Sequence, residues 1–376
     1  MKGINSGLDT AVKHRHMDML ADYRENTLRK HPELRSLFFE LTPRCNLRCR
    51  HCGSRCGEEG GIGGNPDSSE LSVSEYRRIL DEVKEDFDIS GMRLCVTGGE
   101  PLLYPGFFEV MDYANRLGYR WGMTSNGTLI DAECARKLRR CGMRTISVSL
   151  DGLKEDHDWF RQCPGSYDRA VRGIGNLLST GGFSHIQITT VVYHRNIGTL
   201  PRMYEEFRKL GVRSWRVINI EPIGRAKDDP ELLLNKEELR TLIGFIRDRR
   251  FSSGMEVIYG CSHYLGDEYE REVRKWYFLC NAGVYTASVD AAGNLLACLD
   301  IPRIPELIQG NIRNDRIRDV WENRYEVFRT DYRKKGKCAD CPHYPHCAGD
   351  SFHTWDFEKN EPGLCMKGIL FPDGEK

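Results

Sequence analysis

The sequence predicts an α/β protein, a partial (β/α)6 barrel of the TIM type followed by a small cysteine-rich domain. Six short apolar strand patterns alternate with six amphipathic helix patterns between residues 36 and 249. This alternation is typical of a parallel sheet with right-handed crossovers. Six units are too few to close an eight-stranded barrel. After about residue 255 the regular pattern fades, and Gly, Pro and Cys become more frequent.

Each predicted unit begins with a strand and continues into a helix. The strands are expected at residues 36–42, 92–97, 119–124, 145–150, 186–192 and 215–220. The helices are expected at residues 73–87, 107–117, 132–141, 167–179, 200–210 and 236–249. The first of these helices has the clearest start, because Ser72-Val-Ser-Glu75 is a capping box. Before it, the Gly-rich residues 57–64 predict a loop.

Three regions follow from this pattern. Residues 1–33 are polar and predict a helical extension, with a helix from about residue 16 to residue 29. Residues 34–254 hold the partial barrel, and residues 255–376 the cysteine-rich domain. The last region has too little regular apolar pattern for a large core, so we expect bound metal to stabilise it.

The overall composition excludes several classes of partner. The 376 residues include 55 Lys+Arg and 55 Asp+Glu, so the formal net charge is zero. A global attraction to nucleic acid or to an anionic membrane is therefore not expected. No run approaches the ~20 apolar residues of a membrane span, and the first 16 residues lack the apolar core of a signal peptide. We therefore expect a cytoplasmic protein, in which 15 cysteines point to metal rather than to disulfides.

Three cysteines directly after the first strand are the strongest chemical signal. They are spaced as Cys45-x3-Cys49-x2-Cys52. Three thiolates in one short loop can hold three irons of a [4Fe–4S] cluster and leave the fourth iron open. A zinc loop is the alternative, but structural zinc usually takes four ligands in paired spacing. Cys56 is either a spare ligand or a core residue, and core positions are expected for Cys95, Cys134 and Cys141.

Further motifs follow the later strands, at the edge where parallel sheets build their sites. The second strand leads into Gly98-Gly99-Glu100-Pro101, the third into Ser125-Asn126, the fourth into Ser149-Leu150-Asp151 and then Arg161, and the sixth into Ile223-Gly224. Together with the cysteine loop, their order resembles the radical S-adenosylmethionine (SAM) superfamily over residues 34–250.

The resemblance implies a role for each motif around a SAM molecule. Gly98 and Gly99 would let the backbone approach a ligand closely. Glu100 would bind the SAM amino group, while Ser125 and Asn126 would bind the ribose. Ser149 and Arg161 would bind the methionine carboxylate, since the guanidinium fork matches a carboxylate; a surface ion pair is the alternative for Arg161. The adenine would lie near the His51 backbone, Ile223 and Gly224. Pro101 and Asp151 are the last residues of two of these motifs and are counted with the expected cofactor-binding residues.

The late cysteines resemble the SPASM auxiliary-cluster domain. Cys280-x12-Gly293-x4-Cys298 matches the first half of its pattern, and Cys338-x2-Cys341-x5-Cys347 with Cys365 matches the second. The resemblance implies one auxiliary iron–sulfur cluster on Cys338, Cys341, Cys347 and Cys365, with structural zinc as the alternative.

A second auxiliary cluster is less complete. Ser351 stands where the pattern has a cysteine, so this cluster keeps Cys280 and Cys298, with Cys261 as the expected third ligand. Its fourth iron is open, binds substrate, or takes Asp350 or His353 as a ligand. A smaller cluster, or none, is also compatible with the sequence.

The resemblance implies an oxidoreductase. A [4Fe–4S] cluster would reduce SAM to a 5′-deoxyadenosyl radical, and auxiliary clusters would accept the electron left on the substrate. Asp300, after Cys298, is the candidate proton acceptor, and a turn residue is its alternative. A zinc-stabilised adaptor without catalytic activity is the competing class.

We expect the substrate to be a ribosomally synthesised precursor peptide that gains a thioether or C–C cross-link. The alternatives are an anaerobic maturase of an enzyme side chain, of the formylglycine type, or of a peptide-derived redox cofactor. The expected electron donor is a flavodoxin or ferredoxin. Residues 1–33 are too short for a complete leader-binding domain, so leader recognition falls to a separate protein or to the barrel mouth.

Overall fold

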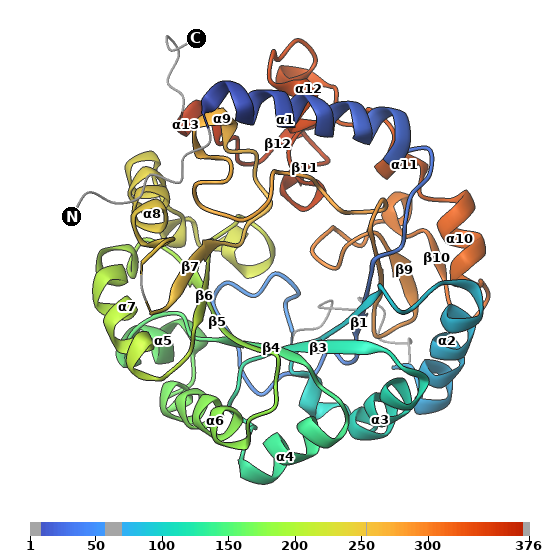
Figure 1. Cartoon of the computed structure of the whole chain (residues 1–376), viewed down its shortest axis with the longest axis vertical. Coiled ribbons are helices and arrows are strands. Elements are labelled where there is room, and N and C mark those ends of the chain that lie inside the picture. The colour runs from blue at the N-terminus through green and yellow to red at the C-terminus, as the bar shows by residue number, and fades with distance from the viewer. Residues whose placement is uncertain (1–8, 57–69, 253, 371–376) are drawn as a thin grey trace.

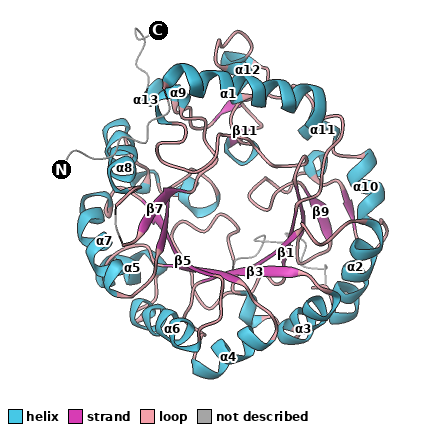
Figure 2. Cartoon of the chain, viewed as in Figure 1, coloured by secondary structure: helices cyan, strands magenta, loops and turns pink. Residues whose placement is uncertain are grey.

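The computed structural model describes residues 9–56, 70–252 and 254–370. The loop predicted at residues 57–64 lies outside these ranges. Strands line the inside of a curved wall and helices cover its outside (Figures 1 and 2). No helix of the described residues is long and apolar enough to cross a membrane.

The six predicted strands are present and pair in parallel in chain order. They are β1 (Ser36–Glu40), β2 (Arg93–Thr97), β3 (Arg120–Ser125), β4 (Thr145–Ser149), β5 (His185–Val192) and β6 (Ser214–Asn219). Most of their buried apolar residues, such as Leu37 and Phe39 on β1, belong to one core. The predicted fold class is confirmed.

The predicted helices lie on the outer face within one or two residues of the expected bounds. They are α2 (Val73–Asp86), α3 (Phe107–Leu117), α4 (Ala132–Arg140), α6 (Ser166–Thr180), α7 (Leu200–Lys209) and α8 (Lys236–Arg249). The capping box is formed, because Ser72 Oγ accepts from Glu75 N at 3.2 Å and Ser72 N donates to Glu75 Oε2 at 2.7 Å. Between residues 36 and 249 the described structure has one further α-helix that the sequence pattern did not predict, α5 (Lys154–Arg161).

The sheet is larger than the six predicted strands. β7 (Glu256–Tyr259) pairs in parallel with β6, and β8 (Thr286–Val289) pairs in parallel with β1. Two short antiparallel strands, β9 (Asn294–Leu296) and β10 (Gly310–Asn311), extend the β8 edge. The sheet thus continues on both sides of the expected boundary at 254/255, and the division into domains there stays a prediction.

The remaining C-terminal elements are short. They are α9 (Gly266–Tyr269), α10 (Ile317–Asn323), α11 (Glu326–Arg329), α12 (Tyr344–Cys347), β11 (Trp355–Asp356), β12 (Glu361–Pro362) and α13 (Lys367–Leu370). Cys341 and Cys365 lie in loops between these elements, and Cys347 is the last residue of α12.

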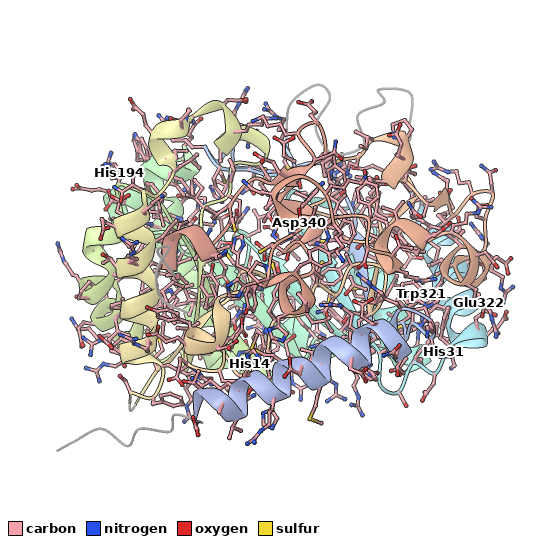
Figure 3. All side chains as sticks on the ribbon, turned by 90° about the horizontal axis from the view of Figure 1, so that it is seen from above. His14, His31, His194, Trp321, Glu322 and Asp340 are labelled. Atoms are coloured by element: carbon pink, nitrogen blue, oxygen red, sulfur yellow. The ribbon has the colours of Figure 1, made fainter. Side chains whose placement is uncertain are left out.

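The N-terminal helix, α1 (Thr10–Tyr23), starts earlier than predicted and ends in one π-helical turn, η1 (Arg24–Leu28). It lies along the C-terminal segment, beside α9 and α12 (Figures 1 and 3). Met17 is buried against Tyr264 and Phe278, and Arg24 Nη2 donates to the Pro345 carbonyl at 2.6 Å. The two ends of the described chain are therefore packed together.

Candidate active site

The loop that carries Cys45, Cys49 and Cys52 begins at the carboxyl end of β1, where its backbone is hydrogen-bonded to the backbone that follows β2. Gly99 N donates to Thr42 O and Glu100 N donates to Arg44 O, both at 2.8 Å. A Cβ atom at Gly98 would lie 2.7 Å from Thr42 O, and one at Gly99 would lie 2.3 Å from Arg44 O. The two glycines therefore let the backbone after β2 approach the backbone after β1 closely, and their predicted approach to a ligand stays a prediction.

This contact gives a first testable prediction. Gly99→Ala should displace the start of the cysteine loop, because its Cβ would collide with the Arg44 backbone. Overpacking of this kind typically costs about 1–3 kcal/mol. We expect a lower free energy of unfolding and reduced iron loading, measured by denaturation and by iron analysis. Gly91→Ala, whose Cβ would meet nothing within 4 Å, is the matched control; equal iron loading in the two variants would contradict the prediction.

Glu100 joins the ends of β2 and β3. Its buried carboxylate accepts from Ser125 Oγ at 2.9 Å and from Asn126 N at 2.8 Å. Burial raises the pKa of Glu100 to about 7, and the two hydrogen bonds oppose that shift. With a third donor at Leu102 N, one of about four lone-pair positions is left for a cation. The predicted set Glu100, Ser125 and Asn126 is thus brought together, and its roles toward SAM stay predictions.

Arg161 forms a buried ion pair, which excludes the surface pair considered from the sequence. Its Nε donates to Asp151 Oδ2 at 2.5 Å, and its side chain is 10% exposed. Its Nη1 lies 3.4 Å from the Cys49 sulfur. The other Asp151 oxygen accepts from Val191 N at 2.9 Å. Asp151 therefore holds the guanidinium against one of the three cysteines, while Ser149 ends β4 nearby in the chain.

The loop after β6 closes the other side of the cysteine loop. Gly224 has φ +54, and a Cβ there would lie 2.2 Å from Cys52 O. Ile223 packs beside Gly53. Arg225 donates from its backbone N to Cys52 O at 3.1 Å and from Nε to Cys49 O at 2.7 Å. The predicted residues Ile223 and Gly224 thus contact the cysteine loop itself.

His51 is held by an aromatic stack that the sequence did not predict. Its ring lies 4.2 Å from that of Phe160, which in turn lies 4.0 Å from that of Tyr193. Burial and the nearby Arg161 charge lower the pKa of His51, so its imidazole is neutral. This stack fixes the loop between Cys49 and Cys52.

The three early thiols have the environment that an anionic cluster needs. Burial raises the pKa of Cys45 to about 11 and also raises that of Cys49, so iron must displace the protons of these two thiols to bind. The hydrogen bond with Cys56 lowers the pKa of the third thiol, Cys52. Arg161 and Arg225 lie close enough to offset thiolate charge.

The spacing of the sulfurs does not match a zinc site. Among the described residues, no three cysteine sulfurs lie within 4.8 Å of one another, whereas a Zn–S length of about 2.3 Å would bring them closer together. Cys56 lies within hydrogen-bonding reach of Cys52.

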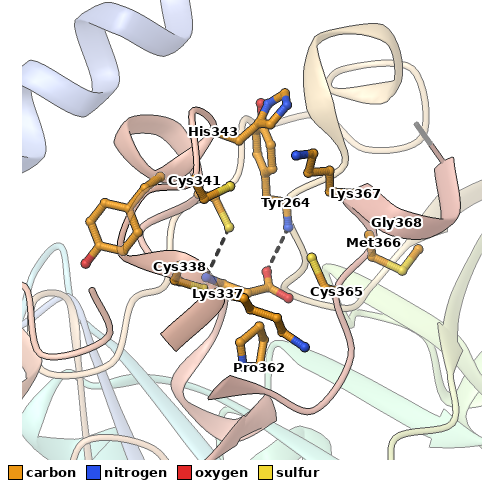
Figure 4. A pocket seen from close by; sticks show the side chains of 14 residues that line it. Tyr264, Lys337, Cys338, Cys341, His343, Pro362, Cys365, Met366, Lys367 and Gly368 are labelled. Carbon is orange, nitrogen blue, oxygen red and sulfur yellow. Dashed lines mark hydrogen bonds between the residues drawn. The ribbon is translucent and has the colours of Figure 1, made fainter. Parts of the chain in front are cut away.

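Four late cysteines line a single cavity of about 320 Å3. They are Cys338, Cys341, Cys347 and Cys365, the four that the sequence groups together, and Figure 4 shows three of them around one hollow. Tyr264, Met366 and Pro362 add apolar walls. Four thiols around a cavity, with no three sulfurs within 4.8 Å in the described chain, fit a cluster better than a zinc ion.

The remaining predicted ligands form a looser group. Cys280 and Cys298 interact electrostatically, and burial raises the pKa of Cys298. Cys261 lies against the Asn219 carbonyl at the end of β6. Ser351 is buried, and its hydroxyl donates to the Ser262 carbonyl, so this side chain is committed to the backbone. The ligand set at this position stays a prediction.

The candidate proton acceptor Asp300 is exposed in the turn after Cys298. Its charge raises the pKa of the neighbouring Cys298. Within the described part of the chain, no hydrogen bond of its carboxylate distinguishes a catalytic residue from the turn residue that was the alternative. Its catalytic role stays a prediction.

Sequence reasoning missed a buried triad between the two sites. His263 Nδ1 lies 2.5 Å from Asp350 Oδ2, and its Nε2 lies 2.6 Å from Glu221 Oε1. Against the effect of burial, the two carboxylates raise the pKa of His263 to about 10. Asp350 N also donates to the Cys347 sulfur at 3.2 Å. The triad links the end of β6 to the four-cysteine cavity. Its three residues lie far apart in the sequence, so no motif indicates that they meet.

Comparison with known proteins agrees with this geometry. Residues 39–217 match the family model of the radical SAM superfamily, and residues 280–342 match SPASM, an iron–sulfur cluster-binding domain. The AdoMet-dependent heme synthase of Methanosarcina barkeri is 30% identical over 350 residues, which cover 87% of this chain and 95% of that protein. The chain belongs to the radical SAM superfamily. It also carries a SPASM domain.

A second similar protein has a different named function, and two solved structures share the fold of this radical SAM protein. The mycofactocin maturase MftC of Mycolicibacterium smegmatis is 30% identical over 321 residues, covering 83% of this chain and 76% of that protein. Streptococcus suis SuiB bound to its precursor peptide SuiA shares the fold, with a TM-score of 0.68 at 16% identity over 93% of this chain and 79% of that chain. The AdoMet-bound anSMEcpe structure has a TM-score of 0.67 at 19% identity, over 85% and 90%.

Membership of this superfamily assigns the cofactors. The protein is an enzyme with a [4Fe–4S] cluster that binds SAM, and its SPASM domain holds auxiliary iron–sulfur clusters. The two cysteine groups agree with this assignment, because in the described part of the chain neither brings three sulfurs within 4.8 Å of one another, as a zinc site would.

Proposed function

We propose that this radical SAM protein oxidatively modifies a peptide. The four-cysteine cavity beside the barrel carries the proposal, since an auxiliary centre can take the second electron of an oxidation. Cross-linking of a ribosomally synthesised peptide was the first expectation. The similarity to mycofactocin maturase supports the alternative, maturation of a peptide-derived redox cofactor.

The residues of the chain would hold and orient the cofactors. When bound, the reduced cluster supplies one electron for the cleavage of SAM, which creates the radical that takes a hydrogen atom from the substrate. We propose Cys45, Cys49 and Cys52 as the ligands of this cluster. Arg161, fixed by Asp151, offsets its negative charge and stays available to a carboxylate. Glu100 keeps one acceptor position for an ammonium group.

A second candidate substrate is an iron porphyrin. It is favoured by one observation, the similarity to AdoMet-dependent heme synthase over 95% of that protein. The two candidates share the cofactors and differ in what enters the barrel mouth.

One experiment separates them. The anaerobically reconstituted protein is given SAM, dithionite and either short peptides encoded by neighbouring reading frames or an iron porphyrin with carboxylate side chains. We expect 5′-deoxyadenosine in step with an oxidised peptide, measured by mass spectrometry. If the porphyrin is modified and no peptide is, the second candidate replaces the proposal. No 5′-deoxyadenosine in any arm, with full iron content, would refute the enzymatic function.

A further inference from the structure

Two imidazoles and two carboxylates gather where α1 meets the C-terminal segment, outside both cysteine sites. His14 and Asp18 lie one turn apart on α1, Asp267 lies on α9 and His346 lies on α12. Figure 3 shows His14 on α1 where this helix faces the C-terminal elements. Ligand atoms of His14, Asp267 and His346 all lie within 4.8 Å of one another. None of these residues belongs to a motif found in the sequence.

The contacts within this group leave one acceptor unused. His14 Nδ1 lies 2.6 Å from Asp267 Oδ2, and His346 Nε2 lies 2.8 Å from Asp18 Oδ1. The two imidazole rings meet edge to face with centroids 5.0 Å apart. Asp267 Oδ1 is buried and has no hydrogen-bond partner among the described residues. A buried carboxylate oxygen without a donor is costly, and a cation would satisfy it.

The three elements are held in place independently of these side chains. Next to His14, the buried Lys13 Nζ donates to Glu268 O at 3.1 Å and to Glu272 Oε1 at 2.5 Å. One turn further, Met17 is buried against Tyr264. Arg24 fastens the end of the helix to Pro345, one residue before His346. These contacts therefore hold α1 against the segments that carry Asp267 and His346 without using the proposed ligands.

We propose that His14, Asp267 and His346 form a binding site for a divalent transition-metal ion of the zinc class. Imidazole nitrogen and carboxylate oxygen are zinc donors, with bonds of about 2.0–2.2 Å. Asp18 is the carboxylate beside the His346 imidazole, as is usual for a metal-bound histidine. Because Cys347 follows His346, the bound ion would tie α1 to the loop that carries a cysteine of the four-cysteine cavity.

Zinc binding to the holoenzyme tests the proposal. The protein with its iron–sulfur clusters in place is passed over a chelating resin and equilibrated with Zn2+. We expect about one zinc per chain in addition to the iron, with nitrogen and oxygen scatterers at about 2.0–2.2 Å in X-ray absorption. His14→Ala and Asp267→Asn should each weaken zinc binding at least about tenfold. Zinc should raise the melting temperature of the wild type and not that of these variants.

His16→Ala is the matched control. His16 is exposed on the same helix and contacts Tyr277, so this variant should bind zinc as the wild type does. Unchanged iron content in His14→Ala shows that the fold and the clusters are intact, and it keeps this test separate from that of the proposed function. Sulfur scatterers at about 2.3 Å would place the zinc in a cysteine site and overturn the proposal. Equal zinc binding by the wild type and His14→Ala would also overturn it, leaving the group as ion pairs alone.

Discussion

Cys49→Ala is expected to abolish SAM cleavage and to remove about four irons per chain. Cys49 is the most buried of the three early cysteines, at 7% exposure, and it alone among them contacts the Arg161 guanidinium. A [4Fe–4S] cluster with two protein thiolates in place of three is not retained. We expect 5′-deoxyadenosine formation to fall by about 1000-fold or more, which corresponds to about 4 kcal/mol in activation free energy. Iron analysis and product quantification measure the two effects.

Cys134→Ala is the control for this variant. Cys134 lies on α4, where alanine favours the helix, and the sequence analysis placed it in the core. It should keep the full iron content and activity. If Cys49→Ala retained its iron and cleaved SAM, the assignment of the early cysteines would be wrong.

Arg161→Ala is expected to lower the free energy of unfolding by about 3–5 kcal/mol, because it leaves the Asp151 carboxylate buried without its charged partner. Asp151 is fully buried, and among the described residues its carboxylate would keep only the hydrogen bond from Val191 N. A surface ion pair would cost at most about 1 kcal/mol, so the size of the effect distinguishes the two descriptions. Chemical denaturation, with midpoint and slope both determined, measures it.

The double variant Asp151→Asn, Arg161→Met tests the cause. Removing both charges should recover most of the lost stability, because no uncompensated charge remains buried. It should not recover SAM cleavage if Arg161 binds the methionine carboxylate. A double variant as unstable as Arg161→Ala would show that the loss comes from packing and not from the isolated charge.

The regular part of the fold was predictable because its signals are local. Strand and helix periodicity in residues 36–249 gave the six parallel strands and their covering helices, and the capping box gave the start of α2. The strands β7 and β8 were missed. Each has four residues, too few to show the alternation of apolar and polar residues that marks a strand. Each is held mainly by pairing with a neighbouring strand, β7 with β6 and β8 with β1.

The sequence by itself determined the cofactor class of this protein, because three cysteines spaced within one short loop can bind one cluster and the motifs that follow the later strands come to the same edge of a parallel sheet. Only the tertiary structure decided which distant groups meet. The Arg161–Asp151 pair against Cys49, the His263 imidazole between two carboxylates, and the histidines of α1 and α12 each join residues far apart in the chain. Such contacts depend on how the elements pack around one another, and a single residue carries no signal of its neighbour in space.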